Sequence, residues 1–554
     1  MMNIISLRLF ALSIILVLSF NLRAQRSQDW EISKNLDIYT SLLQQLNQHY
    51  VDDIQPGQLT KTAINAMLKG LDPYTIYYPE ADIEDVRFMQ TGKYGGIGSY
   101  VHIKNDSLYV GMPTPGFPFY KAGLRAGDLI LKIDNVETTG KKMSEVSDML
   151  RGPSGTKLSV LYRASKDKSQ KTIEITREQI KVKNVPYYGK LNDSTAYVKL
   201  SGFTETAAKE VYEAINAMNK SKELKSLVLD LRFNGGGLLG QAVGILDLFV
   251  PENELIVSVK GKISSENADY KTRMPAVFPN LKVVVLVNNR SASASEIVAG
   301  SFQDLDRAVI MGQKSFGKGL VQKVYKLSYN SQVKITIAKY YIPSGRCIQA
   351  LDYGHKDEKG HAVRTADSLQ AIFKTKNGRP VKDGGGIVPD VTLENSKRAI
   401  IASALSSQYL IFDFATLYVN THDSIKNPED FIVSDELFQA FVTFVKKQNF
   451  KYKTGTDRFM EALDKQAKKE DYYERLKSEI EALQKTLETS KAQEIELHKE
   501  EIKDLLRVEL VSRYYYLAGK VSSSLKTDKE VQAAVELLNN QQEYKAVLSG
   551  NKKQ

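Results

Sequence analysis

An alternation of apolar strands and helices between residues 181 and 395 constrains the fold of this chain more than any other feature. Strand-like runs read STAYVKLSGF, SLVLDLRF, KVVVLVNN, RAVIMGQ and QVKITIAKYYIP, and the helical segments among them read ETAAKEVYEAINAMNK, LLGQAVGILDLFV and SASEIVAGSFQDL. Strands that alternate with helices in this way form parallel sheets covered by those helices. The region therefore predicts an α/β domain with a largely parallel central sheet.

The chain has 554 residues, more than one core usually organises, so we expect further domains on both sides. Residues 25–87 predict a helical region, because apolar residues recur every three to four positions from Ile32 to Tyr50. Short strands with one or two helices predict a small β-rich module over residues 88–180. Residues 396–554 are mostly helical and charged, and the leucine spacing in RLKSEIEALQKTL favours a packed helical bundle.

The N-terminal sequence MMNIISLRLFALSIILVLSFNLRAQ has an early arginine, the apolar run Leu9–Phe20 and small residues before Gln25. This pattern is typical of a secretory signal peptide, here residues 1–24, and the alternative is an uncleaved membrane anchor. Cys347 is the single cysteine, so no intrachain disulfide is expected and cysteine-dependent chemistry outside the cytoplasm is disfavoured. We therefore expect a periplasmic or otherwise exported protein, with membrane association as the alternative.

The net charge of +11 does not indicate a nucleic-acid partner, because basic residues are interspersed with acidic ones, as in KKEDYYERLKSEIEALQK. The segment GHKDEKGH, with His355 and His361, is typical of a solvated loop. It lacks the cysteines and carboxylate arrangement that would support a metal site. No metal or cofactor is implied by the sequence.

The first strand-to-helix junction, SLVLDLRFNGGGLLGQAVG, carries three consecutive glycines at 235–237. Glycines let the backbone turn sharply and expose its N–H groups, and the following helix N-terminus adds positive partial charge. Neither a Walker lysine nor a GxGxxG motif accompanies them, which argues against nucleotide binding. The loop is therefore either a tight turn or a donor of hydrogen bonds to an oxyanion.

The second junction, RSASASEIVAG, places three serines after the strand at 282–289. A nucleophile on such a turn is lifted out of the sheet, and the next backbone N–H points to the same place. For Ser293 that N–H belongs to Ala294. Ser295 is interpreted as the helix N-cap and Ser291 as turn packing. The alternative is a purely structural turn of small residues.

A serine hydroxyl needs a base, and none of the six histidines sits at a strand end. Lys318, in RAVIMGQKSFGKGLVQ, lies between glycines after a short apolar strand. Burial disfavours a charged amine and lowers its pKa, so a lysine here could accept the serine proton. The alternative is an ordinary solvated lysine.

The module at 88–180 resembles a PDZ domain through its GGIG loop, KAGLRAGDLILKIDNV and LRGPSGTKLSVLYR. The resemblance implies that backbone N–H groups capture a terminal carboxylate and that a strand edge pairs with the peptide; the alternative is a spacer domain. Arg151, at the end of the module's helix, is expected to contact the α/β domain at 181–395 when peptide binds, or else to face solvent. The residues expected to bind the peptide are Tyr94, Gly95, Gly96, Ile97 and Gly98.

SASASEIVAG and FGKGLVQ, with LDLRFNGGG upstream and a PDZ-like module before it, resemble the C-terminal processing peptidases, or tail-specific proteases. The resemblance covers about residue 30 to about residue 395. It implies a multidomain α/β and α+β protein, with a crotonase/ClpP-like α/β serine protease core at 181–395. The PDZ domain at 88–180 is inserted, and helical regions lie at both ends of the chain.

The same resemblance assigns roles within the core. Ser293 is the implied nucleophile, Lys318 its base, and Gln322 a hydrogen-bond partner that holds the lysine amine. The implied oxyanion donors are the amides of Ala294 and of a glycine in the 235–237 loop, for which we take Gly236. The family often has Asn-Pro-Gly-Gly where this chain has Asn-Gly-Gly-Gly, which leaves open which glycine donates.

These features predict an exported serine endopeptidase that cleaves proteins near their C-terminal tails through an acyl-enzyme. One alternative is a non-catalytic, PDZ-containing scaffold that binds peptides, and another is acyl transfer or hydrolysis on a non-peptide substrate. Expected partners are C-terminal tails of proteins, with an adaptor protein or a homodimer through the C-terminal helices left open.

Overall fold

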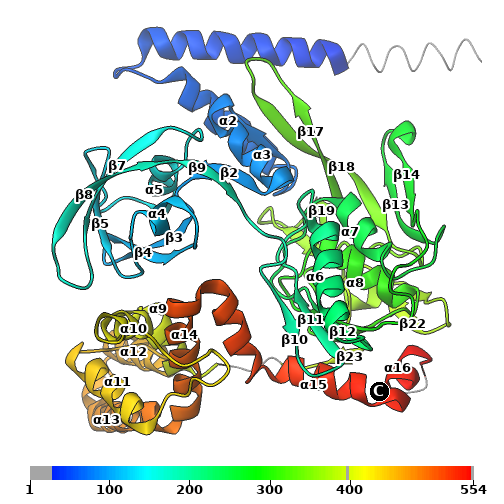
Figure 1. Ribbon diagram of the computed structural model, residues 1–554. Coiled ribbons are helices and arrows are strands. Elements are labelled where there is room, and N and C mark those ends of the chain that lie inside the picture. The colour runs from blue at the N-terminus through cyan, green and yellow to red at the C-terminus, as the bar shows by residue number, and fades with distance from the viewer. Residues whose placement is uncertain (1–27, 395–397, 551–554) are drawn as a thin grey trace, which may run out of the picture. The chain divides into compact units, whose positions relative to one another are not determined.

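The computed structural model describes residues 28–394 and 398–550 (Figure 1). The predicted signal peptide, residues 1–24, lies outside the described residues. The chain divides into two units. The first comprises the residues up to Glu80 together with Val324–Ile335, and the second comprises the rest.

The first unit contains two helices, in the region predicted to be helical, and a small part of a sheet. A helix runs over residues 28–49, and α2 (Pro56–Lys69) begins with a proline, which suits the first turn of a helix. β1 (Ile76–Tyr78) pairs antiparallel with the start of β18 (Gln332–Tyr341), which also pairs with β17 (Leu320–Lys326).

The PDZ-like module of the second unit is an antiparallel sheet with short helices. Its core contains Leu108, Phe119, Val146 and Val160, which are fully buried. The sheet order is β3-β4-β5-β7-β8, so β3 lies at an edge. The strands are β3 (Ser99–Lys104), β4 (Ser107–Pro113), β5 (Leu129–Ile133), β6 (Val136–Glu137, beside β5), β7 (Lys157–Arg163) and β8 (Gln170–Thr176).

Further short elements of the module are three helices and a separate two-stranded ribbon. One strand of the ribbon directly precedes β3 in the chain, and the other directly follows β8. These elements are α3 (Ile83–Thr91), which precedes the ribbon, α4 (Pro118–Lys121), α5 (Met143–Leu150), and the ribbon of β2 (Lys93–Gly96) with β9 (Glu178–Lys181).

The central sheet of the second unit has the order β10-β11-β12-β15-β16-β23. β10 is antiparallel to β11 and every other neighbour is parallel, which confirms the predicted, largely parallel sheet. The strands are β10 (Tyr187–Lys190), β11 (Thr195–Lys199), β12 (Ser226–Asp230), β15 (Lys282–Val287), β16 (Val309–Gly312) and β23 (Val391–Thr392).

One strand that we expected in this sheet lies elsewhere. QVKITIAKYYIP forms β18, which pairs antiparallel with β13 (Leu255–Gly261) in a second sheet that also contains β14 (Ala268–Lys271). An apolar run predicts a strand without saying which sheet it joins. The remaining strands form two hairpins, β19 (Leu351–Lys356) with β20 (Ala362–Arg364) and β21 (Ile372–Lys374) with β22 (Pro380–Lys382).

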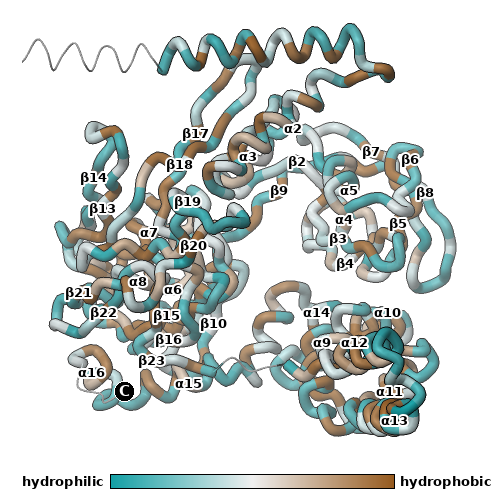
Figure 2. The backbone as a smooth tube through the Cα atoms, turned by 180° about the vertical axis from the view of Figure 1, so that it is seen from behind, coloured by the Kyte–Doolittle hydropathy of each residue, from teal (hydrophilic) through white to brown (hydrophobic). Residues whose placement is uncertain are grey.

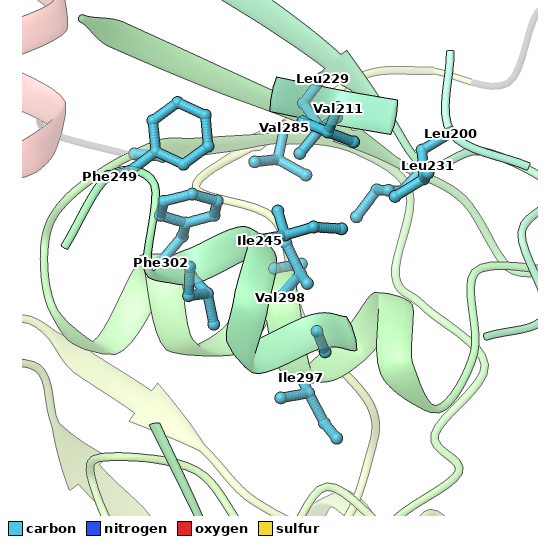
Figure 3. Close-up of a cluster of buried hydrophobic side chains, with 14 of the residues drawn as sticks. Leu200, Val211, Leu229, Leu231, Ile245, Phe249, Val285, Ile297, Val298 and Phe302 are labelled. Carbon is cyan, nitrogen blue, oxygen red and sulfur yellow. The ribbon is translucent and has the colours of Figure 1, made fainter. Parts of the chain in front are cut away.

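Both faces of the central sheet are covered by helices. Successive side chains of a strand point to opposite faces, so Leu229 and Val285 pack into one core and Val228 and Val284 into another. This double burial explains the continuous apolar runs of β12 and β15, of which β15 is labelled in the hydropathy view (Figure 2). Figure 3 shows the first core, to which α6 (Ala207–Ser221), α7 (Leu239–Leu246) and α8 (Ala294–Asp304) contribute Val211, Ile245, Val298 and Phe302.

The predicted C-terminal helical region divides into two parts. Buried residues of α9 (Ile400–Ser407), α10 (Leu410–Thr421), α11 (Asp435–Lys447) and α14 (Lys499–Leu525) form a core of their own, whereas α15 (Lys529–Asn539) and α16 (Gln541–Leu548) cover the second face of the central sheet. Two further helices of this region are α12 (Gly455–Lys469) and α13 (Tyr473–Leu497), and Ile495 of α13 packs against the same core. Within the described ranges no single helix meets the length and hydropathy needed to cross a bilayer; the bent pair α9 and α10 meets them by length and composition only.

Candidate active site

The turn after β15 exposes its three serines unequally. Ser291 and Ser295 are 0% exposed, whereas Ser293 is half-buried. Ser291 Oγ donates a hydrogen bond to the carbonyl of Leu231 at 2.8 Å, and Ser295 Oγ donates to the carbonyl of Asn234 at 2.9 Å. These two hydroxyls hold the turn against the glycine loop, which leaves Ser293 as the most accessible serine of the three.

Ser293 has a backbone conformation that residues other than glycine rarely adopt, with φ 57° and ψ −116°. It is also the N-cap of α8, so the interpretation of Ser295 as the N-cap was wrong. The helix begins earlier than expected because the Ser295 hydroxyl is engaged by the neighbouring loop. Ser293 therefore sits on a strained strand-to-helix turn, directly before the N–H groups of the first helical turn.

The glycine loop lies directly against this turn. Gly236 has φ 95°, and a Cβ atom there would lie 2.8 Å from both Ala294 N and Ser293 Cβ. The Ala292 amide also donates to the Asn234 carbonyl at 3.0 Å. The structure thus brings together the two residues predicted as oxyanion donors, and glycine is the residue that leaves space beside Ser293.

The Gly236 amide already has an acceptor. It donates to Asn234 Oδ1 at 2.9 Å, and Asn234 is itself held by a hydrogen bond from its Nδ2 to the Leu200 carbonyl at 2.8 Å. An oxyanion that used this N–H would have to share it with Asn234. Gly237 follows in the same loop, where a Cβ atom would lie 2.6 Å from the Phe203 carbonyl oxygen.

The loop after β16 brings Lys318 to the serine turn. The Phe316 amide donates to the Ser291 carbonyl at 3.0 Å. The Tyr340 hydroxyl donates to the Ser293 carbonyl at 3.2 Å and also contacts the Lys318 carbonyl. Lys318 is half-buried, and Gln322 on β17 donates from Nε2 to Thr336 Oγ1 at 3.2 Å. Backbone groups of the predicted nucleophile and base are therefore joined through one tyrosine.

Glu296 is a residue that the sequence reasoning missed. Its carboxylate is 0% exposed and accepts hydrogen bonds from the amides of Ser293 (2.8 Å) and Lys318 (2.9 Å). It also accepts from Ser315 Oγ and the Gly317 amide, both at 2.6 Å. Burial raises the pKa of Glu296 to about 7, against the opposing effect of these four donors. The signal was available, because Ser293 followed three residues later by glutamate is a capping-box pattern.

Of the residues predicted to bind the peptide, Tyr94, Gly95 and Gly96 lie in β2 and pair with β9, whereas Ile97 and Gly98 join β2 to the edge strand β3. Ile97 is buried in the module's core, and Gly98 has φ 67° with its Cβ position 2.3 Å from Phe117 Cβ. Arg151 stacks on Tyr94, with its guanidinium 5.2 Å from the ring centroid, and on Phe88 of α3 at 5.8 Å. Arg151 thus lies against the predicted peptide loop itself.

The two histidines of GHKDEKGH are exposed and lie beside aspartates. His355 Nδ1 is 2.7 Å from Asp352 Oδ2, and His361 Nδ1 is 3.5 Å from Asp357 Oδ2. Across the parts of the chain that the structure describes, no group of three or more His, Cys, Asp or Glu residues is arranged to hold a metal ion.

Comparison with known proteins decides the family. Residues 194–354 match the model of peptidase family S41, residues 110–163 match a PDZ domain, and residues 401–538 match the C-terminal helical domain of a probable PDZ-protease. A "Carboxy-terminal-processing protease" of Bartonella bacilliformis is 37% identical over 322 residues, which are 57% of this chain and 73% of that protein. The chain belongs to the carboxy-terminal-processing proteases of peptidase family S41.

Other similar proteins include a "Probable CtpA-like serine protease" of Staphylococcus aureus (strain N315), 32% identical over 62% of this chain and 68% of that protein. A solved structure named photosystem II D1 C-terminal processing protease is 25% identical, with a TM-score of 0.34, over 64% of this chain and 92% of that one. The S41 peptidase is therefore a serine protease with a PDZ domain and a helical C-terminal region, as the sequence predicted.

Proposed function

We propose that this S41 peptidase cleaves proteins near their C-termini by a Ser293–Lys318 dyad. The observation that carries the proposal is the junction of three loops at Ser293. Glu296 accepts from the amides of both Ser293 and Lys318, and Gly236 lies against Ser293. Such buried, hydrogen-bonded loops can hold a nucleophile, a base and oxyanion donors in fixed positions. Groups positioned in advance in this way supply most of the stabilisation of a transition state.

In the proposed reaction, Ser293 Oγ attacks the scissile carbonyl carbon while the neutral Lys318 amine accepts the hydroxyl proton. The tetrahedral oxyanion is stabilised by the Ala294 amide and a glycine amide, helped by the positive end of α8. When the C–N bond breaks, Lys318 gives its proton to the leaving amine and an ester to Ser293 remains. Water then attacks the ester carbon while Lys318 accepts its proton. The bond from Ser293 Oγ to the acyl carbon breaks, Lys318 returns the proton to Oγ, and the new C-terminal carboxyl group leaves with the product. Gln322 positions the lysine amine.

The glycine that completes the oxyanion hole is proposed from the loop geometry. Gly236 lies beside Ala294 N, which supports Gly236 as the second donor. In the resting site the Gly236 amide donates to Asn234 Oδ1. On this proposal Asn234 keeps the Gly236 N–H oriented until the oxyanion forms, so that no loop rearrangement is needed. Gly237 is the alternative donor.

We further propose that the PDZ domain selects substrates by their free C-termini. The glycine loop at Tyr94–Gly98 runs directly into β3, and β3 has a sheet partner on one side only in the described part of the domain. An edge strand offers unpaired backbone groups to a peptide strand, while the loop amides suit a terminal carboxylate. Arg151 stacks on Tyr94, so its contacts can change when a peptide occupies the loop.

The location and the partners are also proposals. The N-terminal apolar segment supports export to the periplasm, with cleavage near Ala24. Protein C-termini are the proposed partners of the PDZ domain, and an adaptor or a second copy are the proposed partners of the C-terminal helices. The ClpP-like class of the α/β core remains a prediction from the resemblance.

The function is tested with an unfolded protein substrate that carries an apolar C-terminus, in free and in amidated form. Wild type should cleave the free form faster, whereas Ser293→Ala and Lys318→Ala should each bind it without cleavage above background. Ser265→Ala, at an exposed serine outside the turn, provides the control. Equal cleavage by wild type and Ser293→Ala would reject the protease proposal, and binding without any cleavage by wild type would favour the scaffold alternative.

A further inference from the structure

A cluster of charged side chains lies behind the glycine loop. Arg232 follows β12 and leads into the loop that contains Gly236. Its guanidinium donates to Asp230 at 2.8 and 3.0 Å, to Asp528 at 2.7 and 3.1 Å, and to Glu530 at 2.6 Å. Asp528 and Glu530 belong to the start of α15, so the C-terminal part of the chain supplies two of the three carboxylates.

Glu530 also reaches the loop that carries Lys318. Gln313 follows β16, and its Nε2 donates to Glu530 Oε1 and, at 3.2 Å, to the Leu393 carbonyl. The other oxygen of the same carboxylate, Oε2, accepts from Arg232. One side chain therefore joins the loop of the oxyanion glycine to the loop of the base.

The cluster is shielded from solvent. The side chain of Arg232 is 12% exposed and that of Asp230 is 1% exposed, while Glu530 is 18% exposed. Lys199 Nζ adds a second cation 3.1 Å from Asp230. Hydrogen bonds between charged groups are stronger than neutral ones, and a partner left without its counter-charge in such a site is costly. These contacts can therefore fix loop positions more firmly than exposed ion pairs do.

The apolar face of α15 holds the carboxylates in place. Val531, Ala534 and Leu538 of this helix pack with Val228 and Val284 on the central sheet. Asp528 caps the helix by accepting from the amides of Glu530 and Val531, both at 3.1 Å. The start of α15 is thus docked beside the ends of β12 and β16, where the catalytic loops begin.

We propose that Asp528 and Glu530 are positioning residues for peptide cleavage, by which the C-terminal helix α15 clamps both catalytic loops. The hydrogen bonds of Arg232 fix the position of the Gly236 amide, and the hydrogen bond from Gln313 to Glu530 fixes the position of Lys318. This inference rests on the proposed dyad. It gives the C-terminal region a role in the chemical step, because loss of the clamp separates the groups that must act together.

The test compares Glu530→Gln with Glu536→Gln, an exposed glutamate on the same helix, in the full-length chain. The measurements are kcat and KM on a tail peptide, the rate of covalent labelling of Ser293 by a fluorophosphonate, and the thermal midpoint. We expect Glu530→Gln to lower kcat and the labelling rate in parallel by about 10- to 100-fold, as for a small misplacement of reacting groups. KM should change less than about twofold, and Glu536→Gln should match wild type on every measure.

A second variant separates positioning from folding. Gln313→Ala removes only the hydrogen bond between Glu530 and the loop that carries Lys318, so it should lower kcat without a change in KM. The double variant Gln313→Ala/Glu530→Gln should be no slower than Glu530→Gln, because both changes release the same contact. If Glu530→Gln cannot be purified folded, kcat of Gln313→Ala decides alone.

The outcomes distinguish this inference from the proposed function. Unchanged kcat in folded Glu530→Gln or Gln313→Ala would overturn the clamp, even where the thermal midpoint falls. Losses of kcat that multiply in the double variant would also overturn it. Cleavage by Ser293→Ala would instead reject the dyad itself. An inactive Ser293→Ala with a fully active Glu530→Gln would leave the proposed function standing and remove the clamp.

Discussion

The serine turn and the PDZ glycine loop both present backbone amides at the start of an element, but they are held in different ways. The serine turn is fixed by hydrogen bonds to the Glu296 carboxylate of α8, the Asn234 carbonyl and the Tyr340 hydroxyl of β18. The PDZ loop is fixed mainly by the space that its glycines leave, as at Gly98 against Phe117. On the proposed function, we therefore expect catalysis to depend on a polar network and tail selection to depend on backbone shape.

The strongest way to break the serine turn is to fill the space at Gly236. Gly236→Ala places a methyl group 2.8 Å from Ala294 N and Ser293 Cβ, in a backbone with φ 95°. Loss of one oxyanion donor typically costs 10²- to 10³-fold in kcat, so we expect a fall of at least about 100-fold. Single-turnover cleavage of a tail peptide measures this effect.

Gly240→Ala is the matched control, because no atom lies within 4 Å of its Cβ position. That variant should keep wild-type kcat. A Gly236→Ala enzyme that is folded and cleaves as fast as Gly240→Ala would show that the glycine loop has no part in the reaction.

A smaller effect is expected from removing the charge at the centre of the network. Glu296→Gln leaves two of the four hydrogen-bond donors facing an NH₂ group, at a cost of about 1–3 kcal/mol for each unsatisfied group. The midpoint temperature of thermal unfolding and kcat should both fall. Glu223→Gln, at an exposed position, should change neither.

The same pair of proteins also gives a pH dependence. Because burial raises the folded-state pKa of Glu296 from 4.5 to about 7, its protonated form is favoured by folding. Its contribution to the free energy of unfolding is therefore full below pH 4.5 and is lost as the pH rises through 7. The stability advantage of wild type over Glu296→Gln should shrink across this window, by at most about 3 kcal/mol. An advantage that grows with pH would contradict the assignment.

The mildest change is expected at the PDZ loop. Gly98→Ala forces the backbone away from Phe117, which misplaces loop amides without touching the dyad. Loss of about one hydrogen bond raises KM for a free-tailed substrate by about fivefold and leaves kcat unchanged. Gly140→Ala shares the positive φ, at 74°, but meets no atom within 4 Å, and should keep the wild-type preference for a free over an amidated tail.

Much of the fold could be predicted because local patterns carry it. The apolar runs of β12 and β15 predict buried strands, and the glycines and serines that follow them indicate the two loops that meet at Ser293. The N-cap was misassigned because the contact that engages Ser295 comes from Asn234, 61 positions away in sequence. Glu296 was overlooked although its capping-box spacing is local.

The clamp could not be predicted from sequence. Arg232 and Glu530 are 298 positions apart, and no periodicity connects a charged loop residue with the first turn of a distant helix. The placement of α15 follows from its apolar face, which predicts burial but not the surface against which it is buried. Likewise, β18 could be predicted as a strand but not assigned to its sheet.

The central claim is that Ser293 is the nucleophile and that Lys318 activates it. Mass spectrometry after reaction with a fluorophosphonate tests this directly, with the site of modification and its rate measured in wild type, Ser293→Ala, Lys318→Met and the exposed-serine control Ser265→Ala. We predict one adduct, on Ser293, formed at the wild-type rate in Ser265→Ala, absent from Ser293→Ala and strongly slowed in Lys318→Met. An adduct on another serine, or labelling of Ser293 at the wild-type rate without Lys318, would contradict this claim.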